Sequence, residues 1–246
     1  MEMKRRDGRK PDELRPVRVE RGFLKNALGS CLFSLGETRV LCAVTLDERV
    51  PPFLEGTGGG WVTAEYALLP ASTNTRVSRS SQQGGRSQEI QRLIGRSLRG
   101  IVNLKNLGPR TCYIDCDVLQ ADGGTRTAAV NGAFFALSDA LVRMRERRLV
   151  TLPVLSDYLA AISVGVVIGA SLLDLDYRED SRASVDCNVV MTGRGKFVEV
   201  QGTGEGSPFS REELERLLSL AQKGSSEIVA LQKEMLGGDL AGILGN

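Results

Sequence analysis

The sequence contains no histidine. This absence excludes serine–histidine and cysteine–histidine nucleophile pairs and every metal site with an imidazole ligand. The chain also lacks a run of about 18 apolar residues, the length needed to cross a membrane, and no apolar segment follows the charged N-terminal residues. We therefore expect a cytoplasmic protein with no membrane partner, whose chemistry uses carboxylates, arginines, backbone amides or a metal ion.

Cysteine is scarce, with five in 246 residues. Cys31, Cys42, Cys112 and Cys116 lie among apolar, strand-like residues and lack the spacing of zinc ligands. This pattern is typical of buried thiols in a reducing compartment, so we expect neither disulfides nor a zinc site. Hydrophobic residues make up 41% of the chain, which is enough for the sizeable core of a folded protein.

The formal net charge is only +2, yet charges of opposite sign are separated along the chain. Between Tyr66 and Arg110, Glu89 is the single acid among many basic residues. Between Asp174 and Asp186 the acids predominate. A basic and an acidic block in one folded chain suggest an anionic partner on one side and a cation on the other.

The periodicity of the apolar residues predicts strands and helices in the order of an α+β fold. Strands are expected at Ser30–Leu35, Thr38–Asp47, Trp61–Tyr66, Thr111–Gln120, Leu159–Ile168, Ser184–Thr192 and Lys196–Gln201. Helices are expected at Ser87–Lys105, from Thr125 to near Arg148, from a capping box at Ser210 and Glu213, and again after Gly224 as far as Leu236. Residues 1–16 favour an extended arm, and Pro70–Gly85 a long polar loop.

Two parts of the chain look alike in outline, because each has hairpin strands followed by a helix. We therefore predict a duplicated strand-hairpin-plus-helix unit with mixed sheets packed on helices, and pseudo-halves at about 10–150 and 151–236. No linker-like segment separates the halves, so residues 1–246 are expected to form a single domain. The glycine-rich tail, residues 237–246, is expected to be flexible or to belong to an interface.

The segment around Gly123-Gly124 holds the first candidate site. The two glycines turn the chain from a strand into a helix, Thr125 is a candidate cap, and Arg126 adds a guanidinium. Backbone N–H groups at such a helix start point outward at the positive end of the dipole, which predicts a site for phosphate or another oxyanion. Arg86 precedes another helix, and the two helix starts could converge on one anion. The alternatives are an ordinary tight turn and, for Arg86, a surface position.

The second candidate site is the acidic segment Asp174–Asp180 together with Asp186 in the following strand. Oxygen ligands without histidine suit Mg²⁺ or another divalent cation, which binds through one or two carboxylates, waters and substrate phosphate. Asp180 could instead act as a general acid toward a leaving oxygen if its pKa were raised. A solvated acidic turn is the alternative, and the sequence leaves these roles open.

Arginines supply candidate contacts to a polyanion. Arg76 and Arg79 lie in the long polar loop, from which side chains reach a nucleic acid more readily than from a buried helix. A second group shares one face of a predicted helix and either follows an RNA backbone or forms ion pairs. This group consists of Arg92, Arg96 and Arg99, and for Arg92 a pair with Glu89 is favoured.

Several segments match motifs of one known family in the same order along the chain. They are Arg6–Arg9, Gly60–Tyr66, Gln88–Arg99, Ile114–Thr127, Leu173–Tyr177 with Glu179–Ser181, and Val189–Gly193 with Phe197–Gly202. Together they resemble the bacterial ribonuclease PH family. The resemblance extends from about Arg6 to Leu236, and the shared order makes it more specific than any single motif.

The resemblance implies a phosphorolytic 3′-to-5′ exoribonuclease that trims tRNA precursors, with inorganic phosphate as co-substrate and nucleoside diphosphates as products. It also implies ribosomal-protein-like βαβ halves and a homo-hexamer built as a trimer of dimers. By matching motifs, the phosphate site falls on Arg86, Gly124, Thr125 and Arg126. The catalytic, metal-associated acids of the family fall on Asp180 and Asp186.

Two positions depart from the family pattern. Ala71 stands where an arginine is expected, which would weaken the grip on tRNA without touching the phosphate site. Ile168-Gly-Ala-Ser171 is an atypical turn. A different class of protein, a non-catalytic RNA-binding ring subunit of an exosome-like assembly, would be expected to lack the phosphate arginines or the acid pair. Both are present here, which favours the enzyme.

Overall fold

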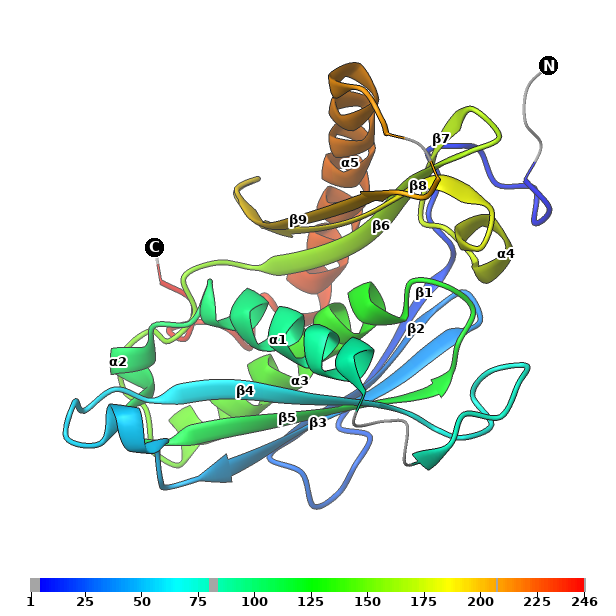
Figure 1. Cartoon of the computed structure of the whole chain (residues 1–246). Coiled ribbons are helices and arrows are strands. Elements are labelled where there is room, and N and C mark those ends of the chain that lie inside the picture. Colours follow the sequence, from blue (N-terminus) through cyan, green and yellow to red (C-terminus); the bar gives the residue numbers. More distant parts are fainter. Residues whose placement is uncertain (1–4, 80–83, 207, 246) are drawn as a thin grey trace.

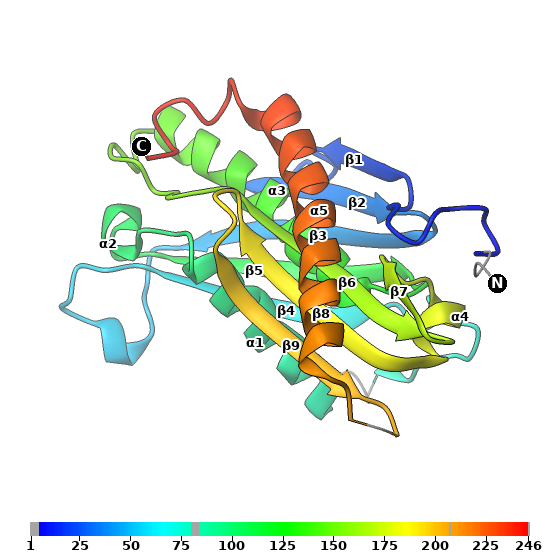
Figure 2. The same ribbon diagram turned by 90° about the horizontal axis from the view of Figure 1, so that it is seen from above.

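The computed structural model describes residues 5–79, 84–206 and 208–245. Two β-sheets lie in separate layers, with helices between them and on one outer face (Figure 1). The middle layer contains α1 (Gly85–Arg99) and α3 (Thr125–Glu146), and α5 (Arg211–Leu236) covers the far face of the second sheet (Figures 1 and 2). Each sheet therefore has an apolar face that packs on helices.

The first sheet has five strands in the order β1-β2-β3-β5-β4. Their bounds are β1 Val17–Arg21, β2 Gly29–Leu35, β3 Thr38–Asp47, β4 Trp61–Leu68 and β5 Thr111–Gln120. The predicted β2–β3 hairpin is confirmed, and β4 runs parallel to β5. Strand β1 was not predicted, because Val17 and Val19 alternate with charged residues over only five positions.

The second sheet has four strands in the order β7-β6-β8-β9. Their bounds are β6 Leu159–Val167, β7 Ala170–Leu173, β8 Ala183–Thr192 and β9 Phe197–Gly204. Every residue of β6 is buried, because α3 covers one face of this strand and α5 the other. The turn that looked atypical is a tight hairpin in which both Ile168 and Gly169 have positive φ angles, 49° and 76°.

Two predicted helix boundaries were wrong. The helix predicted to reach Lys105 ends at Arg99, and after Gly100 a short helix, α2 (Leu104–Leu107), starts from Asn103, whose side chain accepts hydrogen bonds from two backbone N–H groups. The break predicted at Gly224 is absent, because α5 is continuous. A Cβ on Gly224 would lie 2.7 Å from Leu173 Cδ1, so this glycine allows close packing and does not end the helix.

All five cysteines are buried and free, and the predicted burial of Cys31, Cys42, Cys112 and Cys116 is confirmed. The nearest pair, Cys42 and Cys116, face each other across β3 and β5 with their sulfur atoms 3.6 Å apart, far beyond the disulfide length of about 2 Å. The described ranges include no helix with both the length and the apolar character that a bilayer crossing requires.

The N-terminal segment from Arg5 to Pro16 has no helix or strand, as expected for an arm. It nevertheless packs against the second half of the chain, because Arg5, Arg9 and Arg15 are buried. Their partners are Asp174 and Glu179 in the segment between β7 and β8. A small helix in that segment, α4 (Tyr177–Asp180), is thereby fixed beside the glycine turn that precedes α3.

Candidate active site

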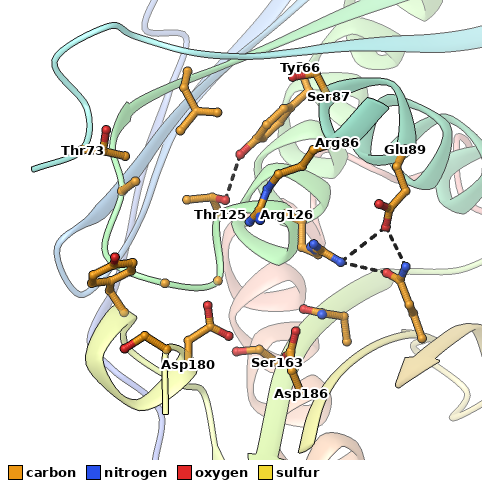
Figure 3. Close-up of a pocket in the computed structure, with 18 of the residues that line it drawn as sticks. Tyr66, Thr73, Arg86, Ser87, Glu89, Thr125, Arg126, Ser163, Asp180 and Asp186 are labelled. Atoms are coloured by element: carbon orange, nitrogen blue, oxygen red, sulfur yellow. Dashed lines mark hydrogen bonds and ion pairs between the residues drawn. The ribbon is translucent and has the colours of Figure 1, made fainter. Parts of the chain in front are cut away.

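A cavity of about 840 Å³ lies between the two halves of the chain. Its walls come from β4, the first turn of α1, the glycine turn before α3, α4 and the strands β8 and β9. Both candidate sites from the sequence open into it, since its lining includes Arg86, Gly124, Thr125, Arg126, Asp180 and Asp186. Figure 3 shows the two arginines across the same space from the two aspartates.

Two of the helices that start at this cavity, α1 and α3, lack a side-chain cap. Gly124 is the N-cap of α3 and has a left-handed conformation (φ 63°), and Gly84 is the N-cap of α1. Neither glycine offers a side-chain acceptor to the first N–H groups of its helix. Amides at two positive helix ends thus remain available for an anion in the cavity.

Thr125 does not cap α3, so its prediction as a candidate cap was wrong. It is the first helical residue, and its Oγ1 accepts a hydrogen bond of 2.8 Å from the hydroxyl of Tyr66 on β4. A cap would have placed the threonine one residue earlier, at the position that Gly124 occupies. The contact with Tyr66 fixes the threonine side chain at the cavity wall (Figure 3).

The two arginines differ in how firmly they are held. Arg86 lies within the first turn of α1, not before the helix, and is exposed to the cavity. Arg126 donates a hydrogen bond of 2.9 Å to Gln201 Oε1 and lies 3.6 Å from Glu89 Oε1. Gln201 Nε2 in turn donates a hydrogen bond of 2.6 Å to Glu89, so that each of these three side chains contacts the other two (Figure 3). Among the described residues, the ion pair of Glu89 is therefore with Arg126 and not with Arg92.

Asp180 and Asp186 are half-buried carboxylates that affect each other. Burial raises the pKa of Asp180, while the charges of Arg86 and Arg126 oppose the rise. Burial, and then repulsion by Asp180, raise the pKa of Asp186 to about 6, again against both arginines. The two acids and the two arginines therefore share one electrostatic environment.

The remaining acids of the Asp174–Asp180 segment are structural. Asp174 is fully buried and accepts hydrogen bonds from Arg15 and Arg9. Asp176 caps α4, and Glu179 completes that capping box and pairs with Arg5. The interpretation of this segment as one group of ligands was thus too broad, because Asp180 is the only acid of the segment that lines the cavity.

The carboxylates fit a hard cation. In the part of the chain that the structure describes, no group of three or more acidic or cysteine side chains could hold a metal ion. The pair Asp180 and Asp186 nevertheless matches the way Mg²⁺ binds proteins, through one or two carboxylates with waters and substrate oxygens in the other positions. A cation between them would also relieve the repulsion that raises the pKa of Asp186.

Substitution of Asp186 by asparagine is expected to stabilise the metal-free protein at neutral pH by about 2 kcal/mol, because a folded-state pKa near 6 makes the charged form costly. The folded state binds the carboxyl proton of Asp186 more tightly than the unfolded state does. The charged carboxylate therefore destabilises the fold above pH 6, and this destabilisation disappears below about pH 4. The melting temperatures of the wild type and of Asp186→Asn, measured with a chelator at neutral pH and at about pH 4, check this. An unchanged melting temperature at neutral pH would show that Asp186 is not strained by burial.

The predicted RNA-contacting arginines lie near the cavity mouth. Arg76 and Arg79 are exposed on the loop after β4, and Thr73 and Val77 of the same loop line the cavity. Ala71 is exposed on this loop. Residues 80–83 of the predicted loop lie outside the described residues.

The arginines on the exposed face of α1 have partners within the chain. Arg96 pairs with Glu199 at 2.5 Å, and Arg99 lies 4.3 Å from the ring centre of Trp61 while donating to the carbonyl of Val62. These contacts join α1 to β9 and β4. They support the ion-pair alternative for Arg96 and give Arg99 a packing role.

Sequence reasoning missed several cavity residues. Tyr66, Ser163, Asn188 and Gln201 all line the cavity, yet none of them was named as a candidate site residue. The alternation of β8 did place Asn188 on the face of Asp186 and not with the core. That shared face was the signal available for Asn188.

Comparison with known proteins agrees with this geometry. Residues 13–143 match the model described as 3′ exoribonuclease family, domain 1, and residues 157–224 match domain 2 of that family. The chain is 56% identical over 246 residues to ribonuclease PH of Moorella thermoacetica, covering 99% of this chain and 98% of the relative. It is also 56% identical over 239 residues to ribonuclease PH of Syntrophomonas wolfei, covering 96% and 100%.

Solved structures show the same fold at lower identity. Rice Rrp46 has a TM-score of 0.76 at 22% identity, with 94% of this chain and all of that chain covered. A chain of the Archaeoglobus fulgidus exosome with RNA bound to the active site has a TM-score of 0.77 at 23% identity, covering 94% and 92%. Matches to both domain models, and to relatives named ribonuclease PH over nearly the whole length, show that the chain belongs to the 3′ exoribonuclease family.

Proposed function

We propose that this protein is a phosphate-dependent 3′-to-5′ exoribonuclease that trims the 3′ ends of tRNA precursors and releases nucleoside diphosphates. The observation that carries the proposal is one cavity in which two uncapped helix starts, each with an arginine, face a pair of half-buried aspartates. Such a cavity suits two anions that must be brought together. The phosphate-binding set is Arg86, Gly124, Thr125 and Arg126, and the catalytic acids are Asp180 and Asp186.

The chemistry begins with an oxygen of inorganic phosphate that attacks the last phosphodiester. A new P–O bond forms, the bond to the 3′ oxygen of the preceding nucleotide breaks, and that oxygen takes up a proton. Repulsion between the anions and their alignment are the main barriers, and fixed positive groups lower both. Arg86 and Arg126 with the helix amides hold the attacking phosphate, so no histidine base is required.

The aspartates act on the opposite side of the reacting bond. They would hold Mg²⁺ or another divalent cation, which supplies positive charge to the phosphodiester and the leaving oxygen. Asp180 has a second available role, since its raised pKa favours a proton that could pass to the leaving oxygen.

RNA would reach the cavity along the exposed loop that carries Arg76 and Arg79. Replacing both by alanine is expected to weaken tRNA binding by about 10-fold at moderate salt and to lower the slope of log affinity against log salt by about 2. The KM for phosphate should not change, because neither residue lines the cavity. Binding measured across a salt series checks this, and an unchanged slope would place the RNA backbone elsewhere.

A ring would supply several such loops to one tRNA, and we propose a homo-hexamer arranged as a trimer of dimers. Two of the structurally similar proteins belong to archaeal exosomes. Light scattering should then give six times the chain mass of 26.6 kDa. The pseudo-halves 10–150 and 151–236 are proposed to act as one domain, because both contribute to the cavity.

The proposal is tested with tRNA extended at its 3′ end, incubated with and without inorganic phosphate. Nucleoside diphosphates that appear only with phosphate are expected. Monophosphate products, or release without phosphate, would reject phosphorolysis. No release under either condition would favour the alternative of a non-catalytic RNA-binding ring subunit, which the presence of both arginines and both aspartates in one cavity disfavours.

A further inference from the structure

Arg15 joins the two turns that carry the proposed chemistry. Its side chain is only 4% exposed. On one side it donates hydrogen bonds to the carbonyl oxygens of Asp122 (2.5 Å) and Gly123 (3.5 Å), directly before the phosphate-binding residues. On the other side it donates to both carboxylate oxygens of Asp174, at 2.7 and 2.9 Å, and to the carbonyl of Leu175 at 3.2 Å.

The two turns are also in direct contact. A Cβ on Gly123 would lie 2.6 Å from the carbonyl oxygen of Leu175, and φ of this glycine is +75°. A Cβ on Gly124 would lie 3.1 Å from Nη2 of Arg15. Because Gly123 has no side chain, the two backbones come close together at this residue, so a shift of either backbone is transmitted to the other.

Asp174 is the acceptor of most of the hydrogen bonds that hold Arg15 to the acidic turn. Its side chain is fully buried and its φ is +55°, a conformation that few residues except glycine, asparagine and aspartate adopt readily. Besides the two contacts above, Oδ2 accepts from the backbone N–H of Arg15 at 2.8 Å and from Arg9 at 3.3 Å. A buried ion pair with this many hydrogen bonds holds both side chains in one geometry, although it adds little to the net free energy of folding.

We propose that Arg15 is a positioning residue that sets the spacing between the glycine turn, residues 123–126, and the acidic turn, residues 174–180, and so between bound phosphate and Asp180. This inference rests on the proposed function. Arg15 does not line the cavity, so its effect on the reaction would pass through the two turns. A displacement of about 1 Å between reacting groups can cost about 100-fold in rate.

Substitution of Arg15 by lysine is the first test. Lysine keeps a positive charge for Asp174 but lacks the planar set of donors that reaches Asp122, Gly123 and Leu175 together. We expect the KM for phosphate to rise by about 10-fold and kcat to fall by about 10- to 100-fold.

Arg5→Lys is the matched control. Arg5 is 2% exposed and bonds Glu179 and the carbonyls of Leu173 and Asp174, all within or before the acidic turn. Its contacts do not include the glycine turn. The control should lower the melting temperature about as much as Arg15→Lys does. We expect its KM for phosphate to stay within about 2-fold of the wild-type value.

A selective rise in the KM for phosphate with Arg15→Lys supports the proposal. Equal effects of both variants, or none in either, would overturn it and leave Arg15 a purely structural residue. If wild-type protein releases no nucleoside diphosphate, the proposed function fails, and calorimetric phosphate affinities of the same variants still decide the positioning claim. If Arg15→Lys does not fold, Arg15→Gln with Asp174→Asn leaves the pair uncharged and keeps a residue that tolerates positive φ, so it is measured in its place.

Discussion

Replacement of Arg126 by alanine is expected to lower phosphate-dependent RNA cleavage by about 10³-fold while tRNA binding persists. The guanidinium stands at an uncapped helix start and is held toward the cavity by Gln201 and Glu89. Its charge is therefore already oriented before phosphate arrives, and such preorganised charge is worth most in the transition state. Cleavage rates over a range of phosphate concentrations, with tRNA binding measured separately, check this result.

Arg96→Ala is the control for Arg126→Ala. It removes the same charge, but from a position outside the cavity where the partner is Glu199. Its cleavage rate should stay within about 3-fold of the wild-type rate, as for an exposed ion pair of small energy. Loss of tRNA binding in Arg126→Ala with an unchanged KM for phosphate would move Arg126 from the phosphate site to the RNA path.

Asp180→Asn is expected to lower kcat by about 10³-fold, through the loss of a cation ligand or of a general acid. The two roles give different responses to magnesium. If Asp180 holds the cation, raised Mg²⁺ restores part of the rate because the remaining ligand, Asp186, still binds weakly. If Asp180 supplies the proton to the leaving oxygen, the rate stays low at every Mg²⁺ concentration.

The pH profile of the wild-type protein belongs to the same experiment. As pH rises through about 6, Asp186 loses its proton and becomes available to a cation, so kcat/KM should rise over this range.

Asp176→Asn is the control for Asp180→Asn, because asparagine keeps the cap of α4 while a neighbouring negative charge is lost. A full rate in Asp180→Asn would remove this carboxylate from the chemistry.

Two central strands of the first sheet were fully predictable, because their apolar residues alternate on one buried face. Thr38–Asp47 and Thr111–Gln120 were predicted at their observed limits. Local patterns failed where a glycine has a tertiary role. Gly224 was taken for a break, but it lies against Leu173 inside a continuous helix, and that contact has no signature in the neighbouring sequence.

The site itself was predictable in its residue types but not in how they are held. The acidic segment from Asp174 to Asp180 gave no sign of which carboxylates meet an arginine in the core. Arg15 and Asp174 are 159 positions apart, and only the packing of the two halves shows that they pair. The contacts of Tyr66 with Thr125 and of Gln201 with Arg126 are equally long-range. Such contacts depend on register and layer packing, which periodicity does not specify.

The most direct test of a cavity that holds phosphate against the end of an RNA strand is the fate of the phosphate. Extended tRNA is incubated with radiolabelled inorganic phosphate, and the released nucleotides are separated. We predict label in the β-phosphate of nucleoside diphosphates, with little incorporation by Arg126→Ala. Unlabelled nucleoside monophosphates from the wild-type protein would mean that water attacks the phosphodiester, and would contradict the account.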